Sequence, residues 1–198
     1  MSLIINLWVE AWQRSLHGPK LELHCKARDH RAPIDWLDES NKKIGEVIYV
    51  RMRVRNVKPR IAKSCRAYLT KVERLKPDGK TWENTNFSEA IQLAWAGQGT
   101  GHGFDAISLP KGVDQFIDVV AVGKLLPFAP PSESTNKLPT FPKPQWAVTL
   151  VRYSKLLERR DTYQLTVLVA GDGVMPISRR IIVKWSGVWD EIDVSDGK

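Results

Sequence analysis

The stretch Glu46–Val57, with the sequence EVIYVRMRVRNV, decides the fold class of this chain. Its side chains alternate between two kinds. The apolar positions are Ile48, Val50, Met52 and Val54, and the intervening ones are Tyr49, Arg51, Arg53 and Arg55. Because successive side chains of a strand point to opposite faces of a sheet, this pattern predicts a β-strand with one buried and one solvated face.

The same two-residue period recurs along the chain. Leu21 and Leu23 begin it, and further short strands are expected at Lys63–Leu75, Ile91–Trp95, Phe104–Leu109, Gln115–Val122 and Trp146–Val151. Near the end, strands over 163–169 and 181–185 flank a Gly171-Asp172-Gly173 turn, which predicts a hairpin. With no alternation of strands and helices, the chain is predicted to be all-β, an antiparallel sandwich or barrel.

Strict alternation also predicts which side chains of Lys63–Leu75 share a face. Cys65, Ala67 and Leu69 fall on one side, and Val72 falls on the other with Arg66.

The first residues follow a helical period instead. Ile4, Trp8 and Trp12 recur at the spacing of one helix face, and Gly18-Pro19 ends the segment. This apolar face needs a cover, which is the chain's own domain, a partner protein, or the membrane interface, where tryptophan is favoured. The segment is too short to span a bilayer, which needs about 20 apolar residues.

These patterns divide the chain into an N-terminal amphipathic helix, residues 1–18, and a β-sandwich domain, residues 19–198. Within the sandwich, residues 123–144 hold six of the twelve prolines and are predicted to form a long surface loop. Residues 28–45 are predicted to be a polar connection.

The composition excludes several classes of protein. The 198 residues are 42% hydrophobic and 26% charged, which is typical of a globular domain rather than a disordered or polytopic membrane protein. The two cysteines, Cys25 and Cys65, have no metal-site spacing with the four histidines, so no metal site is expected. With no secretory signal, they indicate reduced thiols in a cytoplasmic protein.

The strand 50–56 (VRMRVRN) and the segment 62–69 (AKSCRAYL) resemble the two early strands of bacterial immunoglobulin-like or fibronectin-like domains. The Asp78-Gly79 turn and the turn at Leu109–Gly112 are similar to turns of those domains. The resemblance covers most of residues 19–190 and implies an immunoglobulin-like antiparallel β-sandwich that serves as an interaction or spacer module. The two cysteines do not occupy the positions of the antibody disulfide, so no disulfide is expected.

Basic residues concentrate in one part of the chain. Residues 51–80 contain eleven basic and two acidic side chains, against a net charge of +8 for the whole chain. This predicts a surface for phosphates or other anions. The candidate residues are Arg51, Arg53, Arg55, Lys58, Arg60 and Lys63. The alternative is a solvated sheet face, and in an immunoglobulin-like topology the charge would be pooled only at the tip 58–63.

The sequence offers no catalytic signature. The glycine-rich stretch 97–103 lacks the lysine and the following helix of a phosphate-binding loop. Carboxylates cluster around Trp36 and Trp189, where exposed loop charges are the simpler interpretation. We therefore expect no enzyme and no cofactor.

Three roles follow from these features. The first is a non-catalytic binding or accessory module of a bacterial protein that acts through a protein partner. The second is a nucleic-acid-binding module that uses the basic strand. The third is a membrane-peripheral domain docked by its N-terminal helix.

Overall fold

The computed structural model describes residues 18–25, 34–37, 42–98, 103–125, 140–141, 161–188 and 191–197. Within these ranges every regular element is a β-strand, which confirms the all-β prediction for the described part. The predicted helix, including Ile4, Trp8 and Trp12, lies outside the described residues, and so does the strand expected at Trp146–Val151.

The strands follow one another as β1 (Leu21–His24), β2 (Ile34–Leu37), β3 (Lys43–Asn56), β4 (Ala62–Leu75), β5 (Trp82–Asn84), β6 (Ile91–Trp95), β7 (Ile107–Leu109), β8 (Asp114–Leu125), β9 (Thr140–Phe141), β10 (Asp161–Asp172), β11 (Ile177–Trp185) and β12 (Ile192–Asp196). The predicted C-terminal hairpin is confirmed, because β10 and β11 pair antiparallel.

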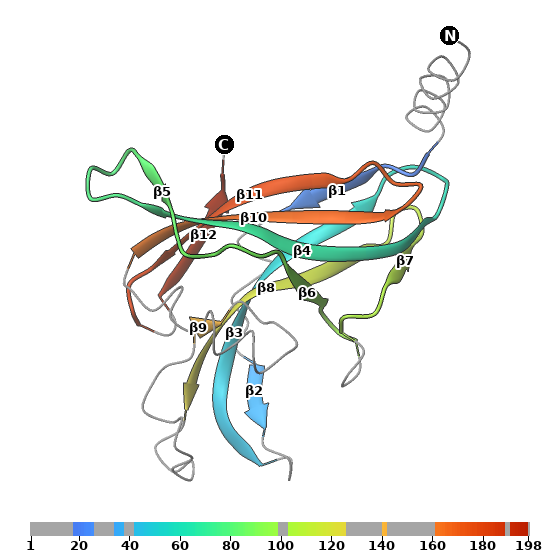
Figure 1. Ribbon diagram of the computed structural model, residues 1–198. Helices are drawn as coiled ribbons and strands as arrows, with labels where there is room; N and C mark the ends of the chain where they lie inside the picture. Colours follow the sequence, from blue (N-terminus) through green and yellow to red (C-terminus); the bar gives the residue numbers. More distant parts are fainter. Residues whose placement is uncertain are drawn as a thin grey trace.

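The strands form one curled sheet, in the order β1-β3-β8-β6-β4-β10-β11-β12 (Figure 1). Short β2 and β9 pair with β3 and β8, while β5 and β7 pair with β4. Strand β6 joins the two halves. Its residues Ile91–Leu93 pair with β4, and its residues Ala94 and Trp95 pair with β8.

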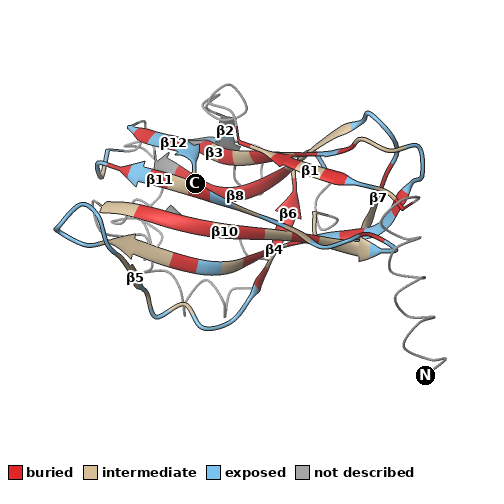
Figure 2. Ribbon diagram, turned by 90° about the horizontal axis from the view of Figure 1, so that it is seen from above, coloured by how far each residue is buried: buried red, intermediate tan, exposed pale blue. Residues whose placement is uncertain are grey.

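The core lies on the inner side of this curl. The apolar residues of β3 that the alternation selected, Ile48, Val50, Met52 and Val54, are all buried. Buried residues also run along β4, β8, β10 and β11 (Figure 2). Because burying a Val, Leu or Ile side chain contributes roughly 1.5–3 kcal/mol, this continuous cluster supplies the main driving force for folding.

A β-bulge corrects the prediction for Val72. The pairing of β4 with β10 skips Thr70, since Leu69 lies opposite Val167 and Lys71 lies opposite Thr166. One extra residue reverses the alternation, so Val72 is buried on the same side as Leu69 rather than facing outward with Arg66.

Four short strands were absent from the sequence prediction, and three of them are β2, β5 and β12. Strand β2 lies within residues 28–45, which were predicted to be a polar connection. Strand β5 follows the turn after β4, and β12 follows the connection after β11. Each pairs along one side with a long strand, β3, β4 or β11. The fourth is β9 (Thr140–Phe141), which pairs with β8. It lies within residues 123–144, which were predicted to form a surface loop, and β8 itself continues into that range as far as Leu125.

Candidate anion-binding end of the sheet

The three arginines of the basic strand β3 face carboxylates of β8. Arg51 donates through Nε to Oδ1 of Asp118 at 2.7 Å, and its guanidinium carbon lies 5.2 Å from the centre of the Tyr49 ring. Such a contact with an aromatic face also stabilises the cation. The charge of Arg51 is thus already matched inside the protein.

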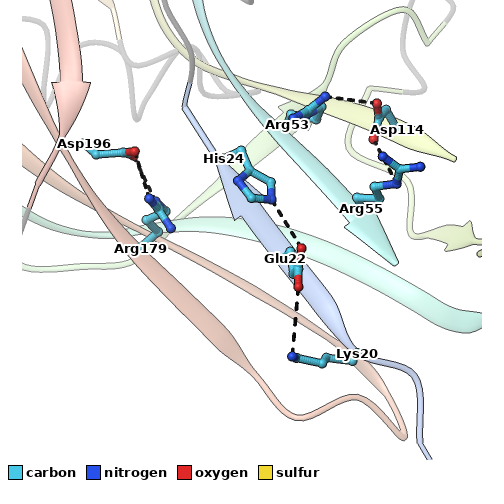
Figure 3. Close-up of polar contacts among 8 residues, drawn as sticks. All are labelled: Lys20, Glu22, His24, Arg53, Arg55, Asp114, Arg179 and Asp196. Carbon is cyan, nitrogen blue, oxygen red and sulfur yellow. Dashed lines mark hydrogen bonds and ion pairs between the residues drawn. The ribbon is translucent and has the colours of Figure 1, made fainter. Parts of the chain in front are cut away.

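Arg53 and Arg55 share the carboxylate of Asp114 (Figure 3). The Arg53 Nη1 atom lies 3.3 Å from Oδ2, and the Arg55 Nε atom lies 3.7 Å from Oδ1. Two carboxylates therefore balance most of the positive charge on this strand. An incoming phosphate would compete with them, which makes the strand itself a weak anion site.

Two of the other three candidates, Lys58 and Arg60, lie in the β3–β4 connection. The third, Lys63, is the second residue of β4. Buried Asn56 holds this connection. Its Nδ2 donates to the carbonyls of Arg60 at 2.6 Å and Leu109 at 2.9 Å, and its Oδ1 accepts from the amide of Lys58 at 3.1 Å. A buried amide with its donors and acceptors satisfied fixes the loops that it bonds.

Asn56 also brings two further segments to the same end. Its Oδ1 accepts from the Lys20 amide at 3.3 Å, just before β1, and its carbonyl accepts from the Gly112 amide at 2.8 Å. Segments 18–20, 57–63 and 110–113 therefore meet around one buried side chain, although they are far apart in the sequence.

The β10–β11 turn reaches this end through a close backbone approach. A side chain at Gly171 would place its Cβ 2.6 Å from the carbonyl oxygen of Lys63 and 2.9 Å from Sγ of Cys65. Beside it, Ser64 has a φ of 51° and forms a bulge in β4, so that Lys63 and Ser64 both point outward while Cys65 is buried. Burial, and then the charge of Asp172, raise the pKa of the Cys65 thiol to about 11.

Together these segments make one surface, which we call the basic–apolar end. It consists of Arg60, Ile61, Lys63, Lys111, Val113 and Met175, and all six side chains are exposed. Segments 18–20, 57–63, 110–113 and 173–176 contain five basic and no acidic residues. Within the described part of the chain, Arg60, Lys63 and Lys111 have no carboxylate partner, whereas Lys20 lies 4.0 Å from Glu22.

Sequence reasoning found Lys58, Arg60 and Lys63 but missed Lys111, Val113 and Met175. One signal was available, because residues 173–176 read Gly-Val-Met-Pro, and an apolar pair is unusual in a tight turn. No local signal indicates that this turn lies beside residue 63. That proximity depends on the register of β4 against β10.

A second basic area lies on the outer face of β4, β10 and β11. A hollow of about 630 Å³ is lined by Thr70, Lys71, Thr166, Ser178, Arg179, Arg180 and Gly197. Two of its cations already have partners. Lys71 lies 2.7 Å from Glu73, and Arg179 lies 2.8 Å from Asp196, which raises the pKa of Arg179 (Figure 3).

One of the carboxylates near Trp36, that of Asp35, forms an ion pair with Lys43. Asp35 lies 2.7 Å from Nζ of Lys43, and hydrogen bonds with Asp35 and then Glu46 raise the pKa of that lysine. Among the residues that the structure describes, no three His, Cys, Asp or Glu side chains are grouped to hold a metal ion. Asp190, one of the carboxylates near Trp189, lies outside the described residues.

The chain matches no protein-family model and no curated protein. Its class therefore follows from its own residues: it is a β-protein with a curled, mainly antiparallel sheet. In the described ranges, no helix has the length and apolarity needed to cross a membrane.

Proposed function

We propose that this chain is a non-catalytic binding module whose partner presents an anionic surface to the basic–apolar end. The observation that carries the proposal is the contrast between two sets of cations. Arg51, Arg53 and Arg55 lie beside carboxylates. Arg60 and Lys111, on fixed loops, and Lys63, at the start of β4, are exposed and have no carboxylate partner among the described residues. Unmatched, preorganised charge favours an external anion.

The proposal includes an immunoglobulin-like arrangement, as in bacterial interaction modules. Two groups of strands, with β3 and β8 in one and β4, β10 and β11 in the other, support it. Strand β6, which pairs with both groups, corresponds to a corner strand of such a sandwich. In such domains the loops at one end of the sandwich are a frequent binding surface.

The test compares two variants with the same change in net charge. The first is Arg60→Gln/Lys63→Gln/Lys111→Gln, and the control is Lys76→Gln/Lys80→Gln/Lys184→Gln, whose lysines are exposed elsewhere. Retention on immobilised heparin, as a general polyanion, is measured against salt concentration. We expect elution at clearly lower salt for the first variant alone. Equal elution of both variants would show that only net charge matters and would refute a site at this end.

A further inference from the structure

The basic–apolar end carries most of the large apolar side chains that are exposed in the described part of the chain. Ile61 is 50% exposed, Val113 42% and Met175 68%. They are three of the four large apolar side chains exposed in the described part, and the fourth, Val188, lies in the β11–β12 connection at the other end. Scattered exposed apolar residues are ordinary, but three at the tips of three converging loops indicate a contact surface.

The aliphatic side chains alternate with the unmatched cations. Arg60 precedes Ile61, and Lys111 lies two residues before Val113. Lys63 lies opposite Asp172 in the strand register, and Asp172 comes just before the turn that carries Met175. An apolar tip surrounded by lysine and arginine fits a bilayer surface, where apolar groups enter the headgroup region and cations meet lipid phosphates.

The composition of these loops argues against nucleic acid as the occupant. Proteins that hold single strands stack bases on aromatic side chains, and segments 18–20, 57–63, 110–113 and 173–176 contain no Phe, Tyr, Trp or His. Aliphatic side chains at the loop tips would gain little binding free energy from contact with a phosphate backbone. They gain free energy in the headgroup and acyl boundary of a membrane.

The loops also suit a partly desolvated position. Each of the three tips contains a proline, at Pro59, Pro110 and Pro176, and proline has no amide proton that would lose a water partner. Buried Asn56 and the close approach at Gly171 hold the tips in place, so little conformational freedom remains to be lost on docking.

The apolar N-terminal residues are attached at the same end. Residues 1–17 join the described domain at Gly18, and the Lys20 carbonyl accepts from the Val57 amide at 2.9 Å in the β3–β4 connection. For their sequence, with Ile4, Trp8 and Trp12, the membrane interface is one of the three covers considered above, beside the chain's own domain and a partner protein.

We infer that the basic–apolar end docks peripherally on an anionic lipid surface, with Ile61, Val113 and Met175 entering the headgroup region and Arg60, Lys63 and Lys111 contacting lipid phosphates. This inference rests on the proposed function and names its partner. The orientation places the β4–β5 turn and the β11–β12 connection away from the membrane (Figure 1).

The first test is co-sedimentation of the full chain with vesicles of phosphatidylcholine, with and without phosphatidylserine. We expect binding only when phosphatidylserine is present. The variant Arg60→Gln/Lys63→Gln/Lys111→Gln should bind roughly a hundredfold more weakly, since each cation near an anionic surface contributes about fivefold. The variant Ile61→Ser/Val113→Ser/Met175→Ser should bind about tenfold more weakly, and Lys76→Gln/Lys80→Gln/Lys184→Gln should lose less than the first.

A second measurement reports the orientation independently of affinity. Both natural cysteines are buried, so a single exposed cysteine introduced as Met175→Cys can carry an environment-sensitive dye, with Val188→Cys as the control at the other end. On phosphatidylserine vesicles the dye emission should shift to the blue at residue 175 and stay unchanged at residue 188.

The outcomes separate the two proposals. Heparin retention that depends on Arg60, Lys63 and Lys111, without vesicle binding, would overturn the membrane inference and leave the proposed function standing. Vesicle binding that neither the serine nor the glutamine variant weakens would also overturn it. If the unmodified chain bound neither heparin nor vesicles, both proposals would be refuted.

Discussion

The Asp118 carboxylate of β8 accepts a hydrogen bond from the Arg51 guanidinium of β3, with 2.7 Å between Oδ1 and Nε. The Asp118 side chain is 5% exposed and the Arg51 side chain 28%. The pairing of β3 with β8 skips Val119, since Val50 lies opposite Val120 and Arg51 lies opposite Asp118. A bulge thus gives a basic strand an internal acidic partner.

Replacing Asp118 by Asn should destabilise the fold by about 2 kcal/mol. Breaking a fully buried pair costs about 3–5 kcal/mol, and water reaches part of the Arg51 guanidinium, which lowers the cost here. Urea unfolding measures the change as a lower midpoint. In the matched variant, Asp114→Asn, a more exposed carboxylate is neutralised, and we expect a loss of about 1 kcal/mol or less. Equal losses would show that burial of Asp118 does not strengthen its pair.

Replacing Asn56 by Ala should both destabilise the fold and loosen the basic–apolar end. The change removes the bonds to the carbonyls of Arg60 and Leu109 and to the amides of Lys20 and Lys58. Buried groups left without a partner cost about 1–3 kcal/mol each, and because the loops can relax toward water we expect a total of about 3 kcal/mol.

Amide hydrogen exchange distinguishes the local effect of this variant from the global one. In Asn56→Ala, exchange should quicken most at Lys58 and Gly112, more than at the paired amides of β10. A uniform change across the sheet would mean that Asn56 stabilises the domain without fixing its end loops.

The sequence predicted the long strands because they carry their signal locally. Eight consecutive residues from Ile48 to Arg55 alternate, so β3 could be located from one stretch. Strand β2 has only four residues, and it exists because β3 offers an edge for Ile34–Leu37 to pair with. Val72 was misplaced for a related reason. A bulge depends on the partner strand, and the residues around Thr70 do not indicate one.

The candidate site was predictable only in part. The basic residues from Arg51 to Lys63 are visible in the sequence, but their sorting into matched and unmatched cations depends on the register between β3 and β8. The position of Lys111 beside this loop depends on Asn56, whose hydrogen bonds span 53 residues of sequence to Leu109. Contacts between residues so far apart in the sequence form only when the whole sheet is assembled, so no local sequence pattern indicates them.

Gly171→Ala should destabilise the domain by about 2 kcal/mol. A Cβ at this position would overlap the carbonyl of Lys63 and the sulfur of Cys65, and backbone atoms must then shift. Gly173 is the matched control. It has a φ of 67° and no atom within 4 Å of a Cβ, so Gly173→Asn should change stability by only a few tenths of a kcal/mol. If thermal unfolding showed the two variants to be equally stable, the close backbone approach at Gly171 would not limit which residue the fold accepts there.

Asp78 should titrate far below an ordinary aspartate. Its Oδ1 accepts from the amides of Lys80 and Thr81, each at 2.9 Å, and its Oδ2 accepts from the Thr81 hydroxyl at 2.6 Å. These bonds, with that of the Thr81 hydroxyl first, lower the pKa of Asp78 from 3.8 to about 2. The turn at Pro77–Lys80, which the sequence predicted, thus holds an ionised carboxylate.

The sign of the pH dependence follows from this shift. A carboxyl whose pKa is lower in the folded state stabilises the fold above its unfolded pKa of 3.8, and the contribution is lost as the pH falls toward about 2. A carbon NMR titration of the Asp78 carboxyl should give a pKa near 2 in the folded chain and near 3.8 in urea. Thr81→Ala removes the hydroxyl and keeps both amide bonds, so the pKa should rise part of the way toward the unfolded value. An unchanged pKa in Thr81→Ala would assign the shift to the backbone amides instead.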